Sequence, residues 1–176
     1  MYFKQTPNTS LLLVDSWSSF KNQNLIEAVT PTDANFQIFN ILPKTTPFIQ
    51  PLDKYGFRQW KNFARKFSDI TLIEQLPFEL FQRNSILKMQ AIIDNQLSSP
   101  QNQNMWKYSW YSCGYTEVHP EFFANPVDFV FGAETAASCF HLNCTFNPFG
   151  RCSWCKYSLC FHHFFRELHF CNTFNS

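Results

Sequence analysis

Two aspartates of this chain occupy positions from which carboxylates can bind divalent cations. Asp15 directly follows the apolar run 11–14, and Asp53 directly precedes a basic segment that begins at Lys54. Four consecutive large apolar residues suit a strand that is covered on both faces of a parallel sheet. One aspartate at the end of such a strand and another at a helix start can meet at the carboxyl edge of the sheet. There they would hold Mg²⁺ ions about 3.5–4 Å apart and support phosphoryl transfer.

The elements around these aspartates are predicted to form a βαβ unit. Residues 11–15 and 36–42 are predicted strands, because the first is an apolar run and the second alternates apolar and polar side chains. A short helix over residues 21–29 connects them, and such a crossover favours parallel pairing. The three prolines at positions 43, 47 and 51 are expected to hold an extended loop that leads to Asp53.

From Tyr55 onward the apolar period becomes helical. One apolar stripe follows the spacing i, i+3, i+7 and i+10, and its members are Phe57, Trp60, Ala64 and Phe67. A second stripe is basic, without an acidic residue between positions 54 and 68, and its members are Lys54, Arg58, Lys61 and Arg65. This stripe is either the solvated face of a core helix or a contact to the DNA backbone. The net charge is only +1, so any attraction to nucleic acid must come from such local clusters.

The two aspartate blocks resemble the DDE transposases of the mariner/pogo superfamily. Leu11-Leu-Leu-Val-Asp-Ser-Trp17 resembles the strand with the second catalytic aspartate, and Pro43-Lys-Thr-Thr-Pro-Phe-Ile-Gln-Pro-Leu-Asp53 resembles the block with the third acidic residue. The resemblance implies catalytic roles for Asp15 and Asp53 in an RNase H-like domain, with Mg²⁺, transposon terminal repeats as the DNA, and a nuclear location. It also implies a first aspartate far upstream, and the fourteen residues before Asp15 contain no acid. We therefore expect the C-terminal half of such a domain, with little or no cleavage.

The last forty residues contain cysteines and histidines in four close pairs. With two, two, two and one residues between partners, the pairs are His141/Cys144, Cys152/Cys155, Cys160/His163 and His169/Cys171. Such spacing lets a tight turn present two ligands to one tetrahedral Zn²⁺. Eight ligands suffice for two structural zinc ions, and in one interleaved arrangement pairs one and three share an ion, as do pairs two and four. Cys139 is an alternative to His141, and His162 is an alternative to His163.

This cysteine-rich segment is also similar to the tail of piggyBac-type transposases, on the residues Arg151-Cys-Ser-Trp-Cys-Lys-Tyr-Ser-Leu-Cys-Phe-His-His-Phe-Phe165 and His169. The resemblance implies a zinc-bound module for DNA or for a protein partner. Disulfides are less expected, because the seven cysteines are an odd number and no export signal is apparent. Cys113 lies outside the cluster and is predicted to be an ordinary core thiol.

The predicted organisation is α/β. A partial RNase H-like domain of parallel strands with helices (1–70) precedes a helical, aromatic-rich extension (71–120), a linker (121–138) and a zinc-binding Cys/His module (139–176). No stretch approaches the ~20 apolar residues of a membrane-spanning helix, so a soluble intracellular protein is expected. The function predicted first is that of a transposase fragment that binds DNA without cleaving it. The alternative is a domesticated, non-catalytic protein that binds DNA or a protein partner through the zinc tail.

Overall fold

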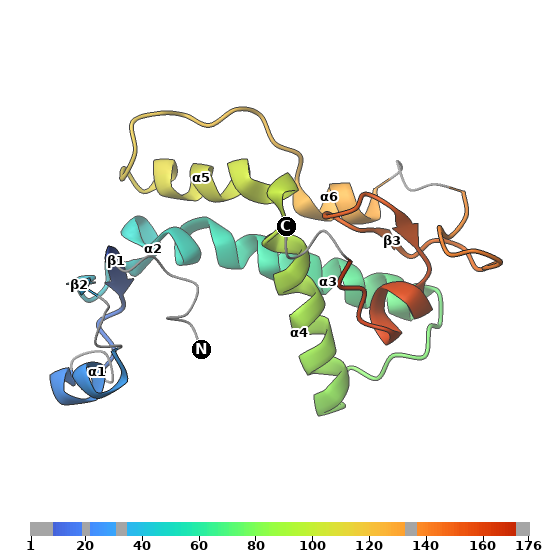
Figure 1. The fold of residues 1–176 in the computed structure, drawn as a ribbon, viewed down its shortest axis with the longest axis horizontal. Coiled ribbons are helices and arrows are strands. Elements are labelled where there is room, and N and C mark those ends of the chain that lie inside the picture. Colours follow the sequence, from blue (N-terminus) through green and yellow to red (C-terminus); the bar gives the residue numbers. More distant parts are fainter. Residues whose placement is uncertain (1–8, 19–21, 31–34, 133–136, 172–176) are drawn as a thin grey trace.

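The computed structural model describes residues 9–18, 22–30, 35–132 and 137–171 of the 176-residue chain. The ends of the predicted domains at 1–8 and 172–176, and residues 133–136 of the predicted linker, lie outside the described residues. Helices dominate, with a small parallel sheet near the N-terminus and a short antiparallel ladder near the C-terminus (Figure 1). Within the described residues, no helix is both long and apolar enough to cross a membrane.

The N-terminal strands β1 (Thr9–Val14) and β2 (Asn35–Asn40) pair in parallel, with α1 (Gln23–Val29) between them in the sequence. The Asn22 side chain caps α1 by accepting a hydrogen bond from the Leu25 backbone N–H at 3.2 Å. The predicted parallel pairing is therefore confirmed. The described sheet has only two strands, so an RNase H-like sheet is not established by it.

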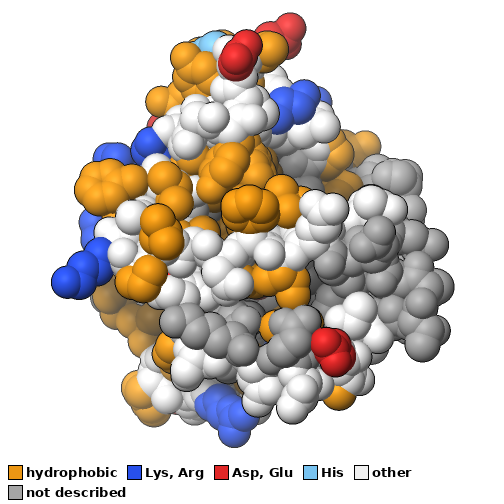
Figure 2. Space-filling view, turned by 90° about the vertical axis from the view of Figure 1, so that its left-hand side faces the viewer, with side chains coloured by type: hydrophobic (Ala, Val, Ile, Leu, Met, Phe, Trp, Pro, Cys, Tyr) orange, Lys and Arg blue, Asp and Glu red, His pale blue; other side chains and the backbone are white. Residues whose placement is uncertain are grey.

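This small sheet carries apolar side chains that it does not bury. Leu11 lies opposite Gln37, and Leu13 lies opposite Phe39 on the same face. Several large apolar side chains of this end are exposed, and they are Leu11, Phe39, Leu42, Phe48 and Leu52. Figure 2 shows hydrophobic side chains gathered in the middle of this face of the molecule. Parallel strands are usually covered on both faces, and this pair is covered incompletely.

The connection to Asp53 differs from the predicted extended loop. A single helical turn, α2 (Thr46–Ile49), is followed by a π-helical turn, η3 (Leu52–Gly56), which continues directly into α3 (Phe57–Ile73). Pro47 lies in the first turn of α2 and Pro51 directly precedes η3. At these positions a missing backbone N–H removes no helical hydrogen bond, so the prolines start turns where an extended loop was expected.

Helix α3 is the central element of the fold (Figure 1). Its buried residues repeat at every fourth position, and they are Gln59, Phe63, Phe67 and Thr71. The predicted apolar stripe is correct at Phe67, which is fully buried, and at Trp60 and Ala64, which pack against the core. It is wrong at Phe57, which is 46% exposed, and it omitted the fully buried Phe63. Helices α4 (Arg83–Leu97) and α6 (Pro126–Phe131) pack against α3. The 3₁₀ turn η4 (Pro100–Asn102) leads into α5 (Gln103–Ser112), which packs against η3. The close approach of Gly56 to the Trp106 ring lets η3 pack against α5.

Helix α6 lies in the segment that was predicted as a linker. Asn125 caps it by accepting the Val127 backbone N–H at 2.9 Å, and Pro126 occupies its first position. Val130 is fully buried against the core that α3 and α4 form. Residues 126–131 are thus part of the folded body. The burial of Val130 stabilises this helix, and an apolar pattern of only six residues is too short to predict it.

The Cys/His tail shares this same hydrophobic core. The Phe67 ring of α3 lies 5.0 Å from the Phe149 ring and 5.1 Å from the Phe165 ring, centroid to centroid. Such edge-on and tilted aromatic contacts add to the burial of large apolar surfaces. The predicted module 139–176 is therefore packed on the helices in its described part.

Candidate metal centres

A compact backbone scaffold presents the cysteines of the tail. The strands β3 (Gly150–Arg151) and β4 (Ser158–Leu159) pair antiparallel, and the π-helical turn η5 (His162–Arg166) follows them. Between the strands, the Lys156 N–H donates to the Cys152 carbonyl at 2.9 Å, and the Cys152 N–H donates to the Tyr157 carbonyl at 2.9 Å. This tight turn brings Cys152 and Cys155 to the same side.

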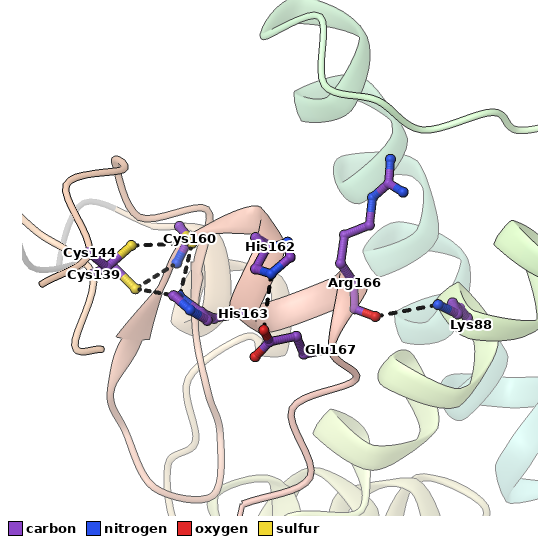
Figure 3. Close-up of polar contacts among 8 residues, drawn as sticks. All are labelled: Lys88, Cys139, Cys144, Cys160, His162, His163, Arg166 and Glu167. Carbon is purple, nitrogen blue, oxygen red and sulfur yellow. Dashed lines mark hydrogen bonds and ion pairs between the residues drawn. The ribbon is translucent and has the colours of Figure 1, made fainter. Parts of the chain in front are cut away.

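The first centre consists of Cys139, Cys144, Cys160 and His163, whose ligand atoms all lie within 4.8 Å of one another. The His163 Nδ1 lies 3.3 Å from the Cys139 sulfur and 3.2 Å from the Cys160 sulfur. The Cys144 and Cys160 sulfurs are 3.8 Å apart. Figure 3 shows the three sulfur atoms converging with the His163 ring at one point.

The second centre consists of Cys152, Cys155, His169 and Cys171, again with all ligand atoms within 4.8 Å of one another. The Cys155 sulfur lies 3.4 Å from the His169 Nε2, and the Cys152 and Cys171 sulfurs are 4.0 Å apart. The β3–β4 turn supplies the first two ligands, and the segment after η5 supplies the other two. The two centres alternate along the chain, because residues 152 and 155 lie between the halves of the first centre.

Both donor sets fit tetrahedral zinc. With Zn–S of about 2.3 Å and Zn–N of about 2.0–2.1 Å, the edges of a tetrahedral Cys₃His site are about 3.6–3.8 Å long. The separations of 3.2–4.0 Å in the two centres bracket these values. Four protein ligands leave no open position, which is the arrangement of a structural zinc site. Two centres that can hold zinc are therefore present.

Burial and mutual hydrogen bonds shift the pKa values of several groups in the two clusters. In the second centre, the Cys155 thiol donates a hydrogen bond that lowers the pKa of Cys152 to about 3, and the same bond raises the pKa of Cys155. In the first centre, burial raises the pKa of Cys160 to about 11 and lowers the pKa of His163. Crowded thiols thus share protons when no cation is present. A bound Zn²⁺ would replace those protons and keep all the thiols deprotonated.

The structure brings together seven of the eight predicted ligands and leaves out His141. The exposed His141 ring stacks on the His163 ring at 3.8 Å and 14° and lies near Glu167, whereas the buried Cys139 contributes its sulfur to the first centre. The four residues between Cys139 and Cys144 are also a zinc-ligand spacing, so the sequence is compatible with Cys139 as well as with His141. His162, the alternative to His163, instead pairs with Glu167 at 3.0 Å (Figure 3).

The two aspartates lie apart from these centres. Asp15 follows β1 and is half-buried, and its Oδ1 accepts the Ser16 backbone N–H at 2.5 Å. Asp53 is exposed in the first turn of η3. In the part of the chain that the structure describes, neither belongs to a group of three or more possible metal ligands.

The basic stripe lies on the outer face of α3. Arg58, Lys61 and Arg65 are exposed, on the side of the helix roughly opposite its buried face. Lys54, at the N-terminal end of the stripe, donates a hydrogen bond to the Ser112 carbonyl of α5. Three cations of the stripe therefore point into solvent, and the fourth is directed toward α5.

The fold and the two centres define a largely helical protein with a Cys/His tail that can hold metal ions. Residues 110–171 match the family model of the Tc5 transposase C-terminal domain, and this range contains every ligand of both centres. The match supports a transposase-derived protein. No match was found among curated proteins or among solved structures.

Proposed function

We propose that this chain is a transposon-derived DNA-binding protein whose tail is held by two structural Zn²⁺ ions. The observation that carries the proposal is the coincidence of the Tc5 transposase match with two Cys₃His clusters of tetrahedral dimensions. When bound, zinc cross-links segments that are distant in sequence. Cys139 and Cys144 would be joined to η5, and the β3–β4 turn would be joined to His169 and Cys171.

The DNA contact that we propose is the exposed basic stripe of α3. Arg58, Lys61 and Arg65 form a row of cations without an intervening acid, and the matched tail packs on the opposite, buried face of the same helix. Phosphate contacts of this kind supply affinity without reading the sequence. A nuclear location would follow from this function.

A catalytic remnant is also part of the proposal. The resemblance to mariner/pogo transposases assigns Asp15 and Asp53 to an RNase H-like domain, and the parallel β1–β2 pair supports that assignment. Two carboxylates lack the ligand that would bridge a pair of Mg²⁺ ions. We therefore expect no Mg²⁺-dependent cleavage of terminal-repeat DNA by this chain. Cleavage that disappears in Asp53→Asn would contradict this expectation.

The test uses the full chain, purified under reducing conditions. Metal analysis is expected to give two zinc ions per chain, and fluorescence anisotropy with labelled duplex DNA is expected to show salt-dependent binding. A zinc content near zero would overturn the metal assignment. Zinc-loaded protein that fails to bind DNA at low salt would overturn the DNA assignment separately.

A second candidate is a protein that binds a protein partner through the zinc tail. The observation that favours it is a set of exposed apolar side chains beside the first centre, namely Phe140, Leu142 and Phe146. Leu142 is 91% exposed, and exposed apolar patches mark interaction sites when they are contiguous. Zinc-loaded protein that ignores DNA but captures a protein through a surface lost in Leu142→Ser would favour this second function.

A further inference from the structure

The side-chain amide of Gln96 lies against the second centre, although this residue belongs to α4 and lies outside the Cys/His tail. Gln96 is fully buried, and its Nε2 lies 3.7 Å from the Cys152 sulfur, to which it donates. Its Oε1 accepts the Ser153 backbone N–H at 2.6 Å. Because that N–H can only donate, the oxygen of the amide must face Ser153, and the NH₂ group must face the sulfur.

The surrounding contacts hold this amide in place. The Gln96 Nε2 also donates to the Asn95 Oδ1 at 3.0 Å, and the Asn102 side chain donates to the backbone carbonyl of Gln96 at 2.8 Å. The Trp154 indole N–H donates to the Asn95 carbonyl at 2.7 Å, so the β3–β4 turn is fastened to the end of α4 at a second point. Both the oxygen and the NH₂ group of the Gln96 side chain are therefore hydrogen-bonded, which offsets the cost of burying an amide.

A donor at this position suits a charged centre. Three thiolates around one Zn²⁺ leave one net negative charge, and a hydrogen bond to a thiolate sulfur stabilises that charge. In the first centre, the Cys139 sulfur accepts the backbone N–H of Cys160 at 3.3 Å, a donor from the tail itself. In the second centre, the side-chain donor comes from the helical body.

We propose that Gln96 is an outer-shell positioning residue of the second zinc centre, and that α4 thereby forms part of that centre. The inference rests on the proposed zinc occupancy of the cluster. The Gln96 amide orients the Cys152 thiolate and lowers its reactivity, while its oxygen fixes the Ser153 backbone at the tip of the turn. The hydrogen bonds of Gln96 then link the second centre to α4, whereas the ligands of both centres all belong to the tail.

The test compares zinc release from variants of the full chain. Gln96→Glu keeps the oxygen for Ser153 and removes the donor to sulfur, and Gln96→Met removes both. Gln59→Glu is the matched control, because Gln59 is a buried glutamine on α3 with an Oε1 that has no hydrogen-bond partner. In competition with a chromophoric chelator, we expect the Gln96 variants to bind one of the two zinc ions about 10-fold to 100-fold more weakly. The control should keep both affinities.

Two readouts separate positioning from simple destabilisation. Alkylation mapped by mass spectrometry should show faster modification of Cys152 in the Gln96 variants, with Cys160 unchanged. In wild-type protein loaded with ¹¹³Cd, NMR should show scalar coupling between the metal and a Gln96 side-chain amide proton. Unchanged zinc release in Gln96→Glu, or absence of the coupling in cadmium-loaded protein, would overturn the inference. Wild-type protein that binds no zinc would instead refute the proposed function.

Discussion

At the residue scale, the choice between Cys139 and His141 shows how burial selects a ligand. Both lie shortly before Cys144, and sequence spacing alone accommodates either. The structure buries Cys139 within reach of Cys160 and His163 and leaves His141 exposed, stacked on the His163 ring. Hydrogen bonds from the backbone N–H groups of Cys160 and His141 outweigh burial and lower the pKa of Cys139.

We expect Cys139→Ser to remove one zinc ion per chain, because a hydroxyl is a poor zinc ligand and the first centre would keep three donors. His141→Gln should keep both ions, since the imidazole contributes no donor to either Cys₃His set. Metal analysis of both purified variants checks this. Cys113→Ser is the control for a thiol outside both centres, and a loss of zinc in His141→Gln would show that His141 is the ligand.

At the element scale, α3 serves two purposes on opposite faces. Its Phe63 and Phe67 are fully buried in the core, while the cations of the basic stripe lie in solvent. The helix therefore connects the tail that it packs against with the surface that we propose for DNA. Each face can be tested by substitutions that leave the other face intact.

Replacing Arg58, Lys61 and Arg65 together by Ala should weaken DNA binding and reduce its salt dependence. Because about three phosphates would no longer be neutralised, the log–log slope of affinity against salt should fall by about 2–3 units. Anisotropy titrations over a salt series measure the slope. The matched control replaces Lys44, Arg83 and Lys107, three exposed cations outside α3. An equal decrease of the slope in the control variant would show that DNA binding depends only on the total charge of the protein.

In α3, we expect substitution of two phenylalanines to lower the free energy of unfolding by different amounts. Phe67→Ala should lower the free energy of unfolding by about 3–5 kcal/mol, because it empties a fully buried site that contacts both the helices and the tail. Phe57→Ala should cost less than about 1.5 kcal/mol, because the side chain is 46% exposed. Urea denaturation of zinc-loaded protein gives both values. Similar costs at the two positions would contradict the observed orientation of α3.

At the scale of the whole molecule, the tail and the helices form one body in the described residues. The core cluster runs from α3 and α4 through α6 to the Cys/His tail. Removing zinc should therefore loosen more than the tail. We expect a chelator to raise hydrogen exchange at residues 95–97 as well as within 139–171, while β1 and β2 remain unchanged. Protection that disappears only within the tail would show that the two parts are independent.

Sequence patterns predicted the local features well and the long-range ones poorly. The apolar run and the alternating segment gave the β1–β2 pair, and close Cys/His pairs gave two interleaved centres. The buried face of α3 was predicted only in part, because the apolar spacing favoured Phe57, which is 46% exposed, over Phe63, which is fully buried. Helix α6 and the role proposed for Gln96 were missed because both depend on contacts across many residues, and no local spacing encodes these.

The alternation of the two centres along the chain has a topological consequence. One zinc ion would close the loop from Cys139 to His163, and the other would close the loop from Cys152 to Cys171, so the loops overlap without either enclosing the other. A single backbone cut between Cys144 and Gly150 would leave both fragments bridged by the first ion. A protease nick at the exposed Phe146 should therefore yield two bands on a denaturing gel but one particle in native mass spectrometry, until a chelator releases the pieces.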